Sequence, residues 1–295
     1  AGARPGPAPA LDTGTTQALT GPKRSGESPL AYAIAGHPAY EVTAPAWGTT
    51  ALADTGARLA ADRTVRAVVL SGEGRAFSAG LDFSGFLAMA RAGEGSVGED
   101  GGASGDRMGA VARTDGRITH LGQQVAHCWS EVPVPVIAAV HGHCLGGGLQ
   151  IAMGADLRIV HPEAKLAVLE IRWGLTPDMT GTATLPRLVG LDVAKELTWT
   201  GRTVTGEEAV RIGLATRLSP TPREDALALA AEIAARNPHA IRGAKRLLDL
   251  SGTRPLAEQY ADERETIFSL IGTPNQAEAV AAYFEEREPT FADPD

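Results

Sequence analysis

Two glycine-rich segments each follow an apolar run that has the length of a buried strand. The first is GEGRAFSAGLDF, residues 72–83, and the second is HGHCLGGGLQIAM, residues 141–153. Glycine leaves backbone N–H groups open to a ligand, because it has no side chain to obstruct them. The triplet Gly146–Gly148 also opens a predicted helix, so its amides lie at the positive end of a helix dipole. Two such loops side by side would direct two N–H groups at one developing oxyanion.

Phosphate binding is the competing chemical interpretation of these loops, and its motifs do not fit. A P-loop requires Gly, four residues and then Gly-Lys-Ser/Thr, and the sequence contains no such string. The dinucleotide pattern G-x-G-x-x-G fails because Phe77 stands where its last glycine would follow Gly72 and Gly74. For either loop taken alone, an ordinary strand-to-helix turn remains an open alternative.

The elements that must position these loops alternate between strand and helix. Strands are predicted at residues 66–72, 135–142, 156–162 and 164–171, and helices at 49–62, 82–92, 117–129 and from Gly147 onward. Beyond residue 180 the pattern is mainly helical, with capping boxes at Thr205–Glu208 and Thr273–Gln276. This order predicts an α/β fold with a largely parallel sheet and a C-terminal helical subdomain.

The composition narrows the class of protein. The chain has 295 residues, a net charge of −8, 43% hydrophobic and 21% charged residues, as is typical of a globular protein with a large core. The negative net charge argues against a protein that binds nucleic acid without sequence specificity, because such a protein needs a basic face. No apolar run reaches the roughly 18 residues of a membrane span, and the first residues lack the pattern of a secretory signal. Cys128 and Cys144 lie in apolar contexts, which favours buried thiols and a reducing, cytoplasmic location.

Five sequence segments point to one family. They are FSAGLDF, AAVHGHCLGGGLQIAMGADLRIV, AKLAVLEIRWGLTPDMTGTATLPRLVG, TGRTVTGEEAVRIGLATRL and PHAIRGAKRLLDL, in this order. Together they resemble the crotonase (enoyl-CoA hydratase/isomerase) superfamily over residues 49–292. The resemblance implies a crotonase-type ββα spiral with a C-terminal helical subdomain. We therefore expect an atypical, irregular segment at 1–48, a crotonase core at 49–220 and a helical oligomerisation region at 221–295.

The resemblance also assigns roles to residues of the two glycine loops. Crotonases bind an acyl-CoA thioester and stabilise its enolate with two peptide N–H groups, whose positions correspond to Leu81 and Gly147. Each such donor is worth about 3 kcal/mol in a transition state. The expected substrate contacts are Arg75, Ala79, Gly80, Asp82, Phe83, Gln150 and Trp173. No metal and no separate cofactor are expected, because coenzyme A is part of the substrate.

The acid–base groups that the resemblance implies differ from those of a typical hydratase. Hydratases of this family carry two Glu residues, and here the first position is Gln150 while the second is Glu170. A neutral amide orients water but does not accept a proton at pH 7. Asp178 lies eight residues after Glu170, which resembles the acidic pair of dienoyl-CoA isomerases, although those also carry Asp at the Gln150 position. Surface roles at a strand end and in a turn are the alternatives for Glu170 and Asp178.

The main expectation is therefore an acyl-CoA enzyme that moves a double bond by proton transfer, with Glu170 and Asp178 as catalytic residues. The alternatives are a hydratase that uses Glu170 alone and a non-catalytic acyl-CoA-binding protein. The family's usual N-terminal β-hairpin is not evident in residues 1–48. The expected partner is an acyl-CoA thioester, without nucleic acid or membrane, and the resemblance implies a homotrimer or homohexamer.

Overall fold

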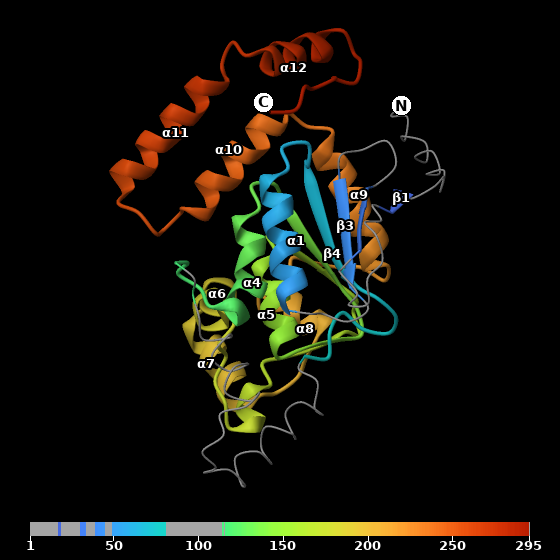
Figure 1. Cartoon of the computed structure of the whole chain (residues 1–295), viewed down its shortest axis with the longest axis vertical. Coiled ribbons are helices and arrows are strands. Elements are labelled where there is room, and N and C mark those ends of the chain that lie inside the picture. The colour runs from blue at the N-terminus through green and yellow to red at the C-terminus, as the bar shows by residue number, and fades with distance from the viewer. Residues whose placement is uncertain are drawn as a thin grey trace, which may run out of the picture.

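The main feature of the structure is a twisted sheet with helices on both faces (Figure 1). It is a computed structural model that describes residues 49–80, 114 and 116–294, together with the backbone of residues 17–18, 30–33 and 39–44. Within these residues, the main sheet has the strands β1 (Gln17–Ala18), β2 (Leu30–Ala33), β3 (Ala39–Ala44), β4 (Ala67–Gly72), β5 (Val136–Val140), β7 (Leu157–Val160) and β10 (Arg217–Leu218).

The strands of the sheet follow the order β1-β2-β3-β4-β5-β7-β10. The pairs β1–β2 and β2–β3 are antiparallel, and every pair from β3–β4 onward is parallel. Strands β4 and β5 are neighbours, with Val69 opposite Ile137. The predicted parallel arrangement of the two strands that lead into the glycine loops is confirmed.

The residues before residue 49 that the structure describes form strands, whereas we expected an irregular segment. Strands β2 and β3 form an antiparallel pair, with Ala31 opposite Val42, and β3 continues the sheet parallel to β4. The expectation failed because these strands are short, and their sequences LAYA and AYEVTA contain few strongly apolar residues. Their strand conformation depends on pairing with residues distant in the sequence, which local pattern reading does not detect.

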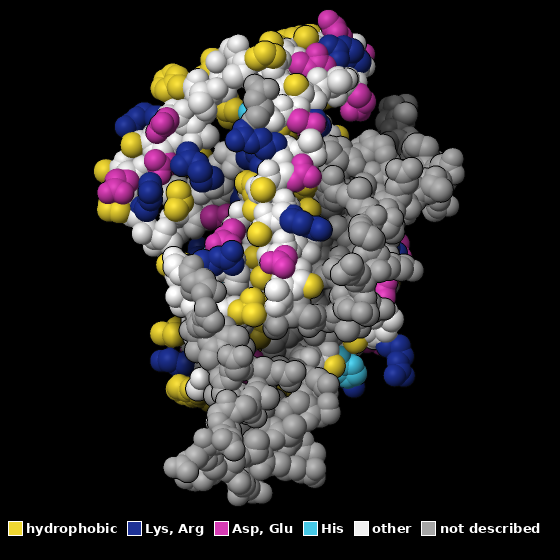
Figure 2. Space-filling view, in the orientation of Figure 1, with side chains coloured by type: hydrophobic (Ala, Val, Ile, Leu, Met, Phe, Trp, Pro, Cys, Tyr) yellow, Lys and Arg dark blue, Asp and Glu magenta, His cyan; other side chains and the backbone are white. Residues whose placement is uncertain are grey.

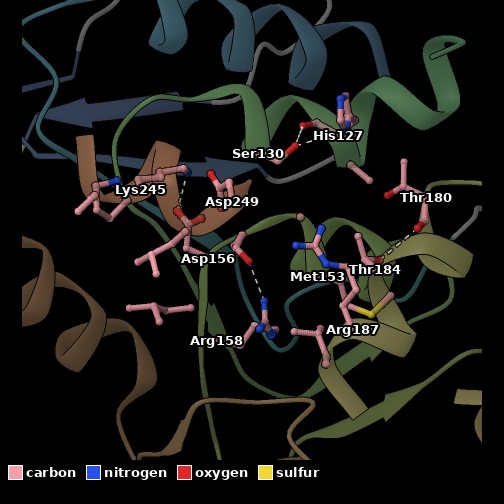
Figure 3. Close-up of a pocket in the computed structure, with 18 of the residues that line it drawn as sticks. His127, Ser130, Met153, Asp156, Arg158, Thr180, Thr184, Arg187, Lys245 and Asp249 are labelled. Atoms are coloured by element: carbon pink, nitrogen blue, oxygen red, sulfur yellow. Dashed lines mark hydrogen bonds and ion pairs between the residues drawn. The ribbon is translucent and has the colours of Figure 1, made fainter. Parts of the chain in front are cut away.

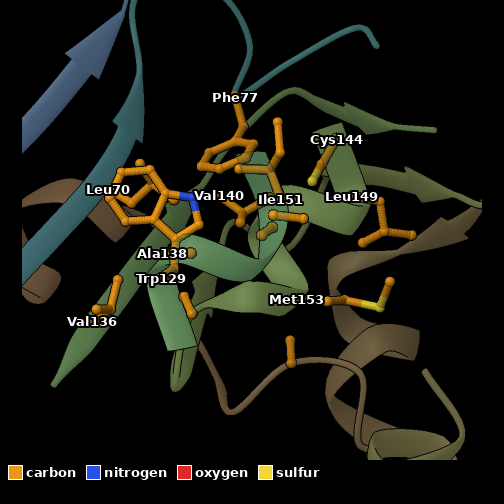
Figure 4. Packing of buried hydrophobic residues seen from close by; sticks show 14 of the residues in the cluster. Leu70, Phe77, Trp129, Val136, Ala138, Val140, Cys144, Leu149, Ile151 and Met153 are labelled. Atoms are coloured by element: carbon orange, nitrogen blue, oxygen red, sulfur yellow. The ribbon is translucent and has the colours of Figure 1, made fainter. Parts of the chain in front are cut away.

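The central strands present alternate side chains to two separate cores. Helices α1 (Thr49–Ala61), α4 (Leu121–Glu131) and α5 (Gly147–Gly154) cover one face, and α9 (Pro222–Ala234) covers the other. On β5, Val136, Ala138 and Val140 join the first core with Trp129 (Figure 4). Ile137 and Ala139 join the second core with the alanines of α9. Because α9 packs against the sheet, the body extends beyond the boundary at residue 220 that we expected.

Helix α4 begins later than its apolar spacing indicated. The side chain of His120 accepts hydrogen bonds from the N–H groups of Gly122 and Gln123, and the Gln123 side chain accepts one from the N–H of His120. This reciprocal cap starts the helix at Leu121. Ile118, which lies inside the predicted helix at 117–129, is therefore outside α4 and 89% exposed.

A second, smaller sheet lies at the end of the molecule where the glycine loops meet. It consists of β6 (His143–Leu145), β8 (Lys165–Ala167) and β9 (Val204–Thr205). A short 3-10 helix, η1 (Glu170–Trp173), follows β8, and helices α6 (Gly181–Val189), α7 (Leu191–Thr200) and α8 (Gly206–Arg211) come after it. The Thr205 hydroxyl accepts a hydrogen bond from the N–H of Glu208, which is the N-cap bond of the predicted capping box.

The last helices extend away from the sheet, at the opposite end of the molecule from α6 and α7 (Figure 1). They are α10 (Pro238–Asp249), α11 (Leu256–Leu270) and α12 (Pro274–Phe284), and Thr273 caps the last of them as predicted. The residues after α12 return to the start of β4, where Arg66 pairs with Asp293 at 2.7 Å. In the described part of the chain, no helix combines the length and the apolar character needed to cross a membrane.

Candidate active site

The two glycine loops meet side by side, as the sequence predicted. The N–H of Ser78 donates to the carbonyl of His143 at 2.9 Å, and the N–H of Leu145 donates to the carbonyl of Ser78 at 3.0 Å. The first loop therefore runs along strand β6, which ends directly before the glycine triplet. A Cβ atom on Gly148 would lie 2.5 Å from Cβ of Ser78, so only glycine permits this contact.

Gly80 and Gly147 bring their backbones together at the end of these loops. Gly80 has φ +89°, a conformation that residues with a side chain rarely adopt. A Cβ atom built on Gly80 would lie 2.9 Å from the carbonyl oxygen of Leu145 and 4.0 Å from the nitrogen of Gly147. The first loop thus brings Gly80 itself next to the N-terminus of α5.

Within the described residues, the N–H of Gly147 donates to no backbone carbonyl. Gly147 is the first residue of α5, so no carbonyl of the helix faces its N–H group. The helix dipole adds positive potential at the same point. Its predicted partner in the oxyanion hole, Leu81, lies outside the described residues, as do Asp82 and Phe83. The two-donor arrangement therefore stays a prediction, and of the two predicted donors the structure describes only Gly147.

Glu170 is the half-buried carboxyl group next to this glycine triplet. It is the first residue of η1 and not the end of a strand, because β8 stops at Ala167. A Cβ atom on Gly146 would lie 3.6 Å from its Oε1. Oε1 accepts a hydrogen bond of 2.6 Å from Nε2 of Gln150, and buried Oε2 has no hydrogen-bond partner among the described residues.

The pKa of Glu170 is raised above that of an ordinary carboxyl group. Burial is the largest cause, because it disfavours the charged form. The hydrogen bond from Gln150 lowers the pKa, and the negative charge of Asp178 raises it. A carboxyl group with a raised pKa exchanges protons more readily near neutrality, which suits an acid–base catalyst.

Gln150 connects Glu170 to the start of α6. Its side chain is 1% exposed. Its Oε1 accepts hydrogen bonds from the N–H groups of Met179 at 2.9 Å and Gly181 at 3.0 Å. Sequence reasoning missed both donors, because they become close only through the left-handed conformation of Thr180 (φ +72°). The sequence shows no signal for that conformation, which is uncommon for threonine.

The remaining predicted site residues are more exposed. Asp178 is exposed, although its charge acts on Glu170. Trp173 is 49% exposed, so it does not fill the core. Arg75 and Ala79 are exposed in the first loop. The structure therefore brings together Gly80, Gly147, Gln150 and Glu170, with Asp178 at the margin.

A separate cavity of about 580 Å³ lies between α4, α6 and α10 (Figure 3). None of the predicted site residues lines it. It contains the ion pair between Lys245 and Asp156, whose Nζ and Oδ2 atoms are 2.6 Å apart. Lys245 also donates to the carbonyl of Val134 at 3.1 Å, so its charge is satisfied within the protein.

The fold and the site define a class of protein: parallel strands and helices that bring a glycine triplet at a helix N-terminus next to a half-buried carboxyl group. The family model described as enoyl-CoA hydratase/isomerase matches residues 48–294. The chain belongs to the enoyl-CoA hydratase/isomerase family. It is thus an enzyme of a family whose substrates are acyl-CoA thioesters, and the predicted superfamily and crotonase fold are confirmed.

Individual relatives are named as hydratases. The chain is 32% identical over 232 residues to the short-chain-enoyl-CoA hydratase of Clostridium acetobutylicum, which covers 77% of this chain and 80% of that protein. It is 39% identical over 165 residues to the mitochondrial enoyl-CoA hydratase domain-containing protein 2 of Mus musculus, covering 54% of this chain and 56% of that one. The crystal structure of an enoyl-CoA hydratase from Bacillus anthracis superimposes with a TM-score of 0.75 at 27% identity, over 88% of this chain and 97% of that one.

Proposed function

We propose that the protein hydrates the double bond of a 2-enoyl-CoA with Glu170 as its single acid–base group. The observation that supports this most is the asymmetric environment of Glu170: Gln150 binds one oxygen, and the other is buried without a partner among the described residues. The names of the relatives favour hydration over the isomerisation that we first expected. The expected dienoyl-CoA isomerase subgroup has no such support.

One carboxyl group is sufficient for the proton balance of hydration. The thioester oxygen accepts the N–H of Gly147, which stabilises the negative charge of the enolate. As the water oxygen bonds to C3, one water proton moves to Oε2 of Glu170, and the electrons of the double bond move to the thioester oxygen. Glu170 then returns this proton to C2, which restores the thioester and the carboxylate. The net result is addition of water across the double bond.

Isomerisation remains a second candidate, and one observation favours it. Asp178 is close enough for its charge to raise the pKa of Glu170, so a second carboxyl group borders the site. In this reaction Glu170 would remove a proton from one carbon, and Asp178 would return one further along a dienoyl chain. The exposure of Asp178 counts against this role, because bulk water competes with the substrate for contact with an exposed carboxyl group.

Turnover of two substrates separates these functions. We expect the protein to hydrate a short-chain 2-enoyl-CoA, and the reaction is measured by the loss of the conjugated absorbance of the substrate. Glu170→Gln should abolish the reaction. Asp178→Asn should leave hydration nearly unchanged. If the protein instead converts a 3,5-dienoyl-CoA and Asp178→Asn abolishes that reaction, it is an isomerase. Binding of an acyl-CoA without turnover of either substrate would make it a binding protein and refute both.

We also propose that the protein assembles as a trimer or a pair of trimers through its C-terminal helices. Large apolar side chains on α11 and α12 face solvent, as Figure 2 illustrates for these helices at the top of the molecule. Phe268 is 71% exposed, and Tyr283 and Phe284 are each 79% exposed. Apolar area of this kind is favourably buried against another copy of the chain.

A cytoplasmic location also remains a proposal. Cys128 and Cys144 are free and buried, as expected. Burial raises the pKa of the Cys128 thiol to about 12, so it is unreactive at neutral pH. Relatives include bacterial and mitochondrial proteins. Two buried thiols are compatible with a reducing compartment.

A further inference from the structure

The orientation of the Gln150 amide is determined by the backbone around Thr180. Thr180 has φ +72°, and the N–H groups on either side of it, from Met179 and Gly181, converge on one atom of Gln150. Successive N–H groups around a left-handed residue form a concave nest that binds an oxygen. An amide has one accepting end and one donating end. Its oxygen therefore occupies the nest, and its nitrogen faces Glu170.

This orientation makes the two oxygens of Glu170 unequal. Oε1 receives the Nε2–H of Gln150 at a distance of 2.6 Å, and a donor at this position favours the charged form of the carboxyl group. A proton on Oε1 would point at another donor, so Oε1 is a poor site for protonation. Oε2 is buried and has no hydrogen-bond partner in the described part of the chain.

We propose that Gln150 is a positioning residue that, through the nest at Met179 and Gly181, binds Oε1 of Glu170 and leaves Oε2 as the oxygen that exchanges protons with the substrate. The inference rests on the proposed function, because it takes Glu170 as the acid–base group. Gln150 itself does not touch the reacting atoms. It acts by fixing the carboxyl group and by favouring its charged form, against the effect of burial.

The same geometry explains why an amide suits this position when one carboxyl group does the chemistry. A Glu at position 150 would place one oxygen in the nest and the other about 2.6 Å from Oε1 of Glu170. Two carboxylates at that distance do not both ionise, so they would share one proton. Gln150 avoids this coupling, and Glu170 therefore titrates as a single group.

The arrangement also links the carboxyl group to the oxyanion donor. A Cβ atom on Gly147 would lie 2.9 Å from Sδ of Met179, so the side chain of a nest residue packs directly on the glycine whose N–H binds the thioester oxygen. A change at Gln150 that releases the nest is therefore expected to move Met179 as well. The effect on Glu170 must be measured separately from this effect on the oxyanion site.

The test is the titration of Glu170 in Gln150→Met and Gln150→Glu. The full-length protein is titrated by infrared absorption of its protonated carboxyl group, with Glu170→Gln as the subtracted reference. The pH dependence of kcat/KM for a short-chain 2-enoyl-CoA is measured in parallel. Gln124→Met is a matched control, because Gln124 is also buried, at 3% exposed, and donates to Glu131 at 2.6 Å outside the site.

In Gln150→Met we expect the titration midpoint of the Glu170 carboxyl group to rise by about one pH unit, because the charged form loses a hydrogen bond. The limb of the kcat/KM profile that reports Glu170 should move by the same amount. Gln124→Met should lower stability and leave both unchanged. Gln150→Glu keeps an oxygen for the nest, so it carries the test if Gln150→Met does not fold, and it should titrate in two coupled steps.

An unchanged Glu170 midpoint in Gln150→Met, or a single-step titration in Gln150→Glu, would overturn the role of Gln150. An equal shift in Gln124→Met would do the same, because it would show a general loss of structure. Failure of the proposed function looks different: Glu170→Gln would then retain full turnover. The infrared titration needs no turnover, so it decides the role of Gln150 even in that case.

Discussion

The N–H group of Gly147 can be removed with little other change, which makes its role directly testable. Proline lacks the N–H group and is well tolerated at the first position of a helix, where Gly147 lies. The preceding residue, Gly146, has φ +53° and ψ −122°, outside the helical region that a following proline disfavours. Gly147→Pro should therefore keep helix α5 and lose the donor.

The Gly147→Pro substitution has two effects on turnover, which must be separated: it removes the N–H donor, and it adds side-chain carbon atoms. Any side chain at position 147 brings a Cβ atom to 2.9 Å from Sδ of Met179 and 3.7 Å from its Cε, which is the flexible end of that side chain. Gly147→Ala carries the same Cβ and retains the N–H group, so we expect a loss of less than about tenfold from it. Removing an oxyanion donor costs about 100- to 1000-fold in kcat, or roughly 2.7–4 kcal/mol.

The comparison of the two variants is the decisive measurement. Hydration of a short-chain 2-enoyl-CoA is followed by its conjugated absorbance, and kcat and KM are determined for wild type, Gly147→Ala and Gly147→Pro. Circular dichroism and thermal unfolding confirm that both variants fold. We expect Gly147→Pro to be at least about 100-fold slower than Gly147→Ala, mainly in kcat. If the two variants turn over within about threefold of each other, Gly147 does not supply an oxyanion donor.

Three further predictions concern stability and assembly. Because the pKa of Glu170 is raised in the folded protein, the charged form of this group lowers stability at a pH above its ordinary pKa. Glu170→Gln should therefore raise Tm at pH 7. This gain in Tm should disappear below about pH 4, where the carboxyl group is protonated in both the folded and the unfolded state. Lys245→Met leaves Asp156 without its cation and should lower the free energy of unfolding by about 3 kcal/mol in urea titrations, with part of the loss recovered by adding Asp156→Asn. Phe268→Asp combined with Tyr283→Asp should shift the mass in light scattering to that of a monomer, and an unchanged mass would exclude this surface from the contact.

Much of the body was predictable because the relevant signals are local. The apolar runs that became β4 and β5 are buried on both faces, as their sequences indicated. The capping residues Thr205 and Thr273 precede α8 and α12. They were recognisable because each is a Thr followed three residues later by Glu or Gln, a pattern typical of a helix N-terminus. The glycine loops meet because parallel neighbours deliver their carboxyl ends to the same edge of the sheet.

The parts that escaped prediction depend on distant contacts. β3 is a strand because β2 and β4 lie on either side of it, and its own sequence is too mixed to show it. Glu170 begins a 3-10 turn that ends at Gly174, whose φ of +70° closes the turn. The nest at Met179 and Gly181 needs Gln150, about 30 positions earlier in the sequence, as its acceptor. No periodicity or motif in the sequence encodes that pairing.

The environment of Glu170 contains opposing effects whose balance sets the pH at which it works. Burial and the charge of Asp178 raise its pKa, and the hydrogen bond from Gln150 lowers it. A group that first accepts and then returns one proton must populate both its charged and its protonated form near the working pH. An effect that only raised or only lowered the pKa would favour one form too strongly. If Gln150 were a second carboxylate, its charge would add to that of Asp178, and whenever the shared proton lay on Glu170 that group could not accept one from water. A neutral donor, held in place by two backbone N–H groups, therefore fits a site in which one carboxyl group carries the proton in both directions.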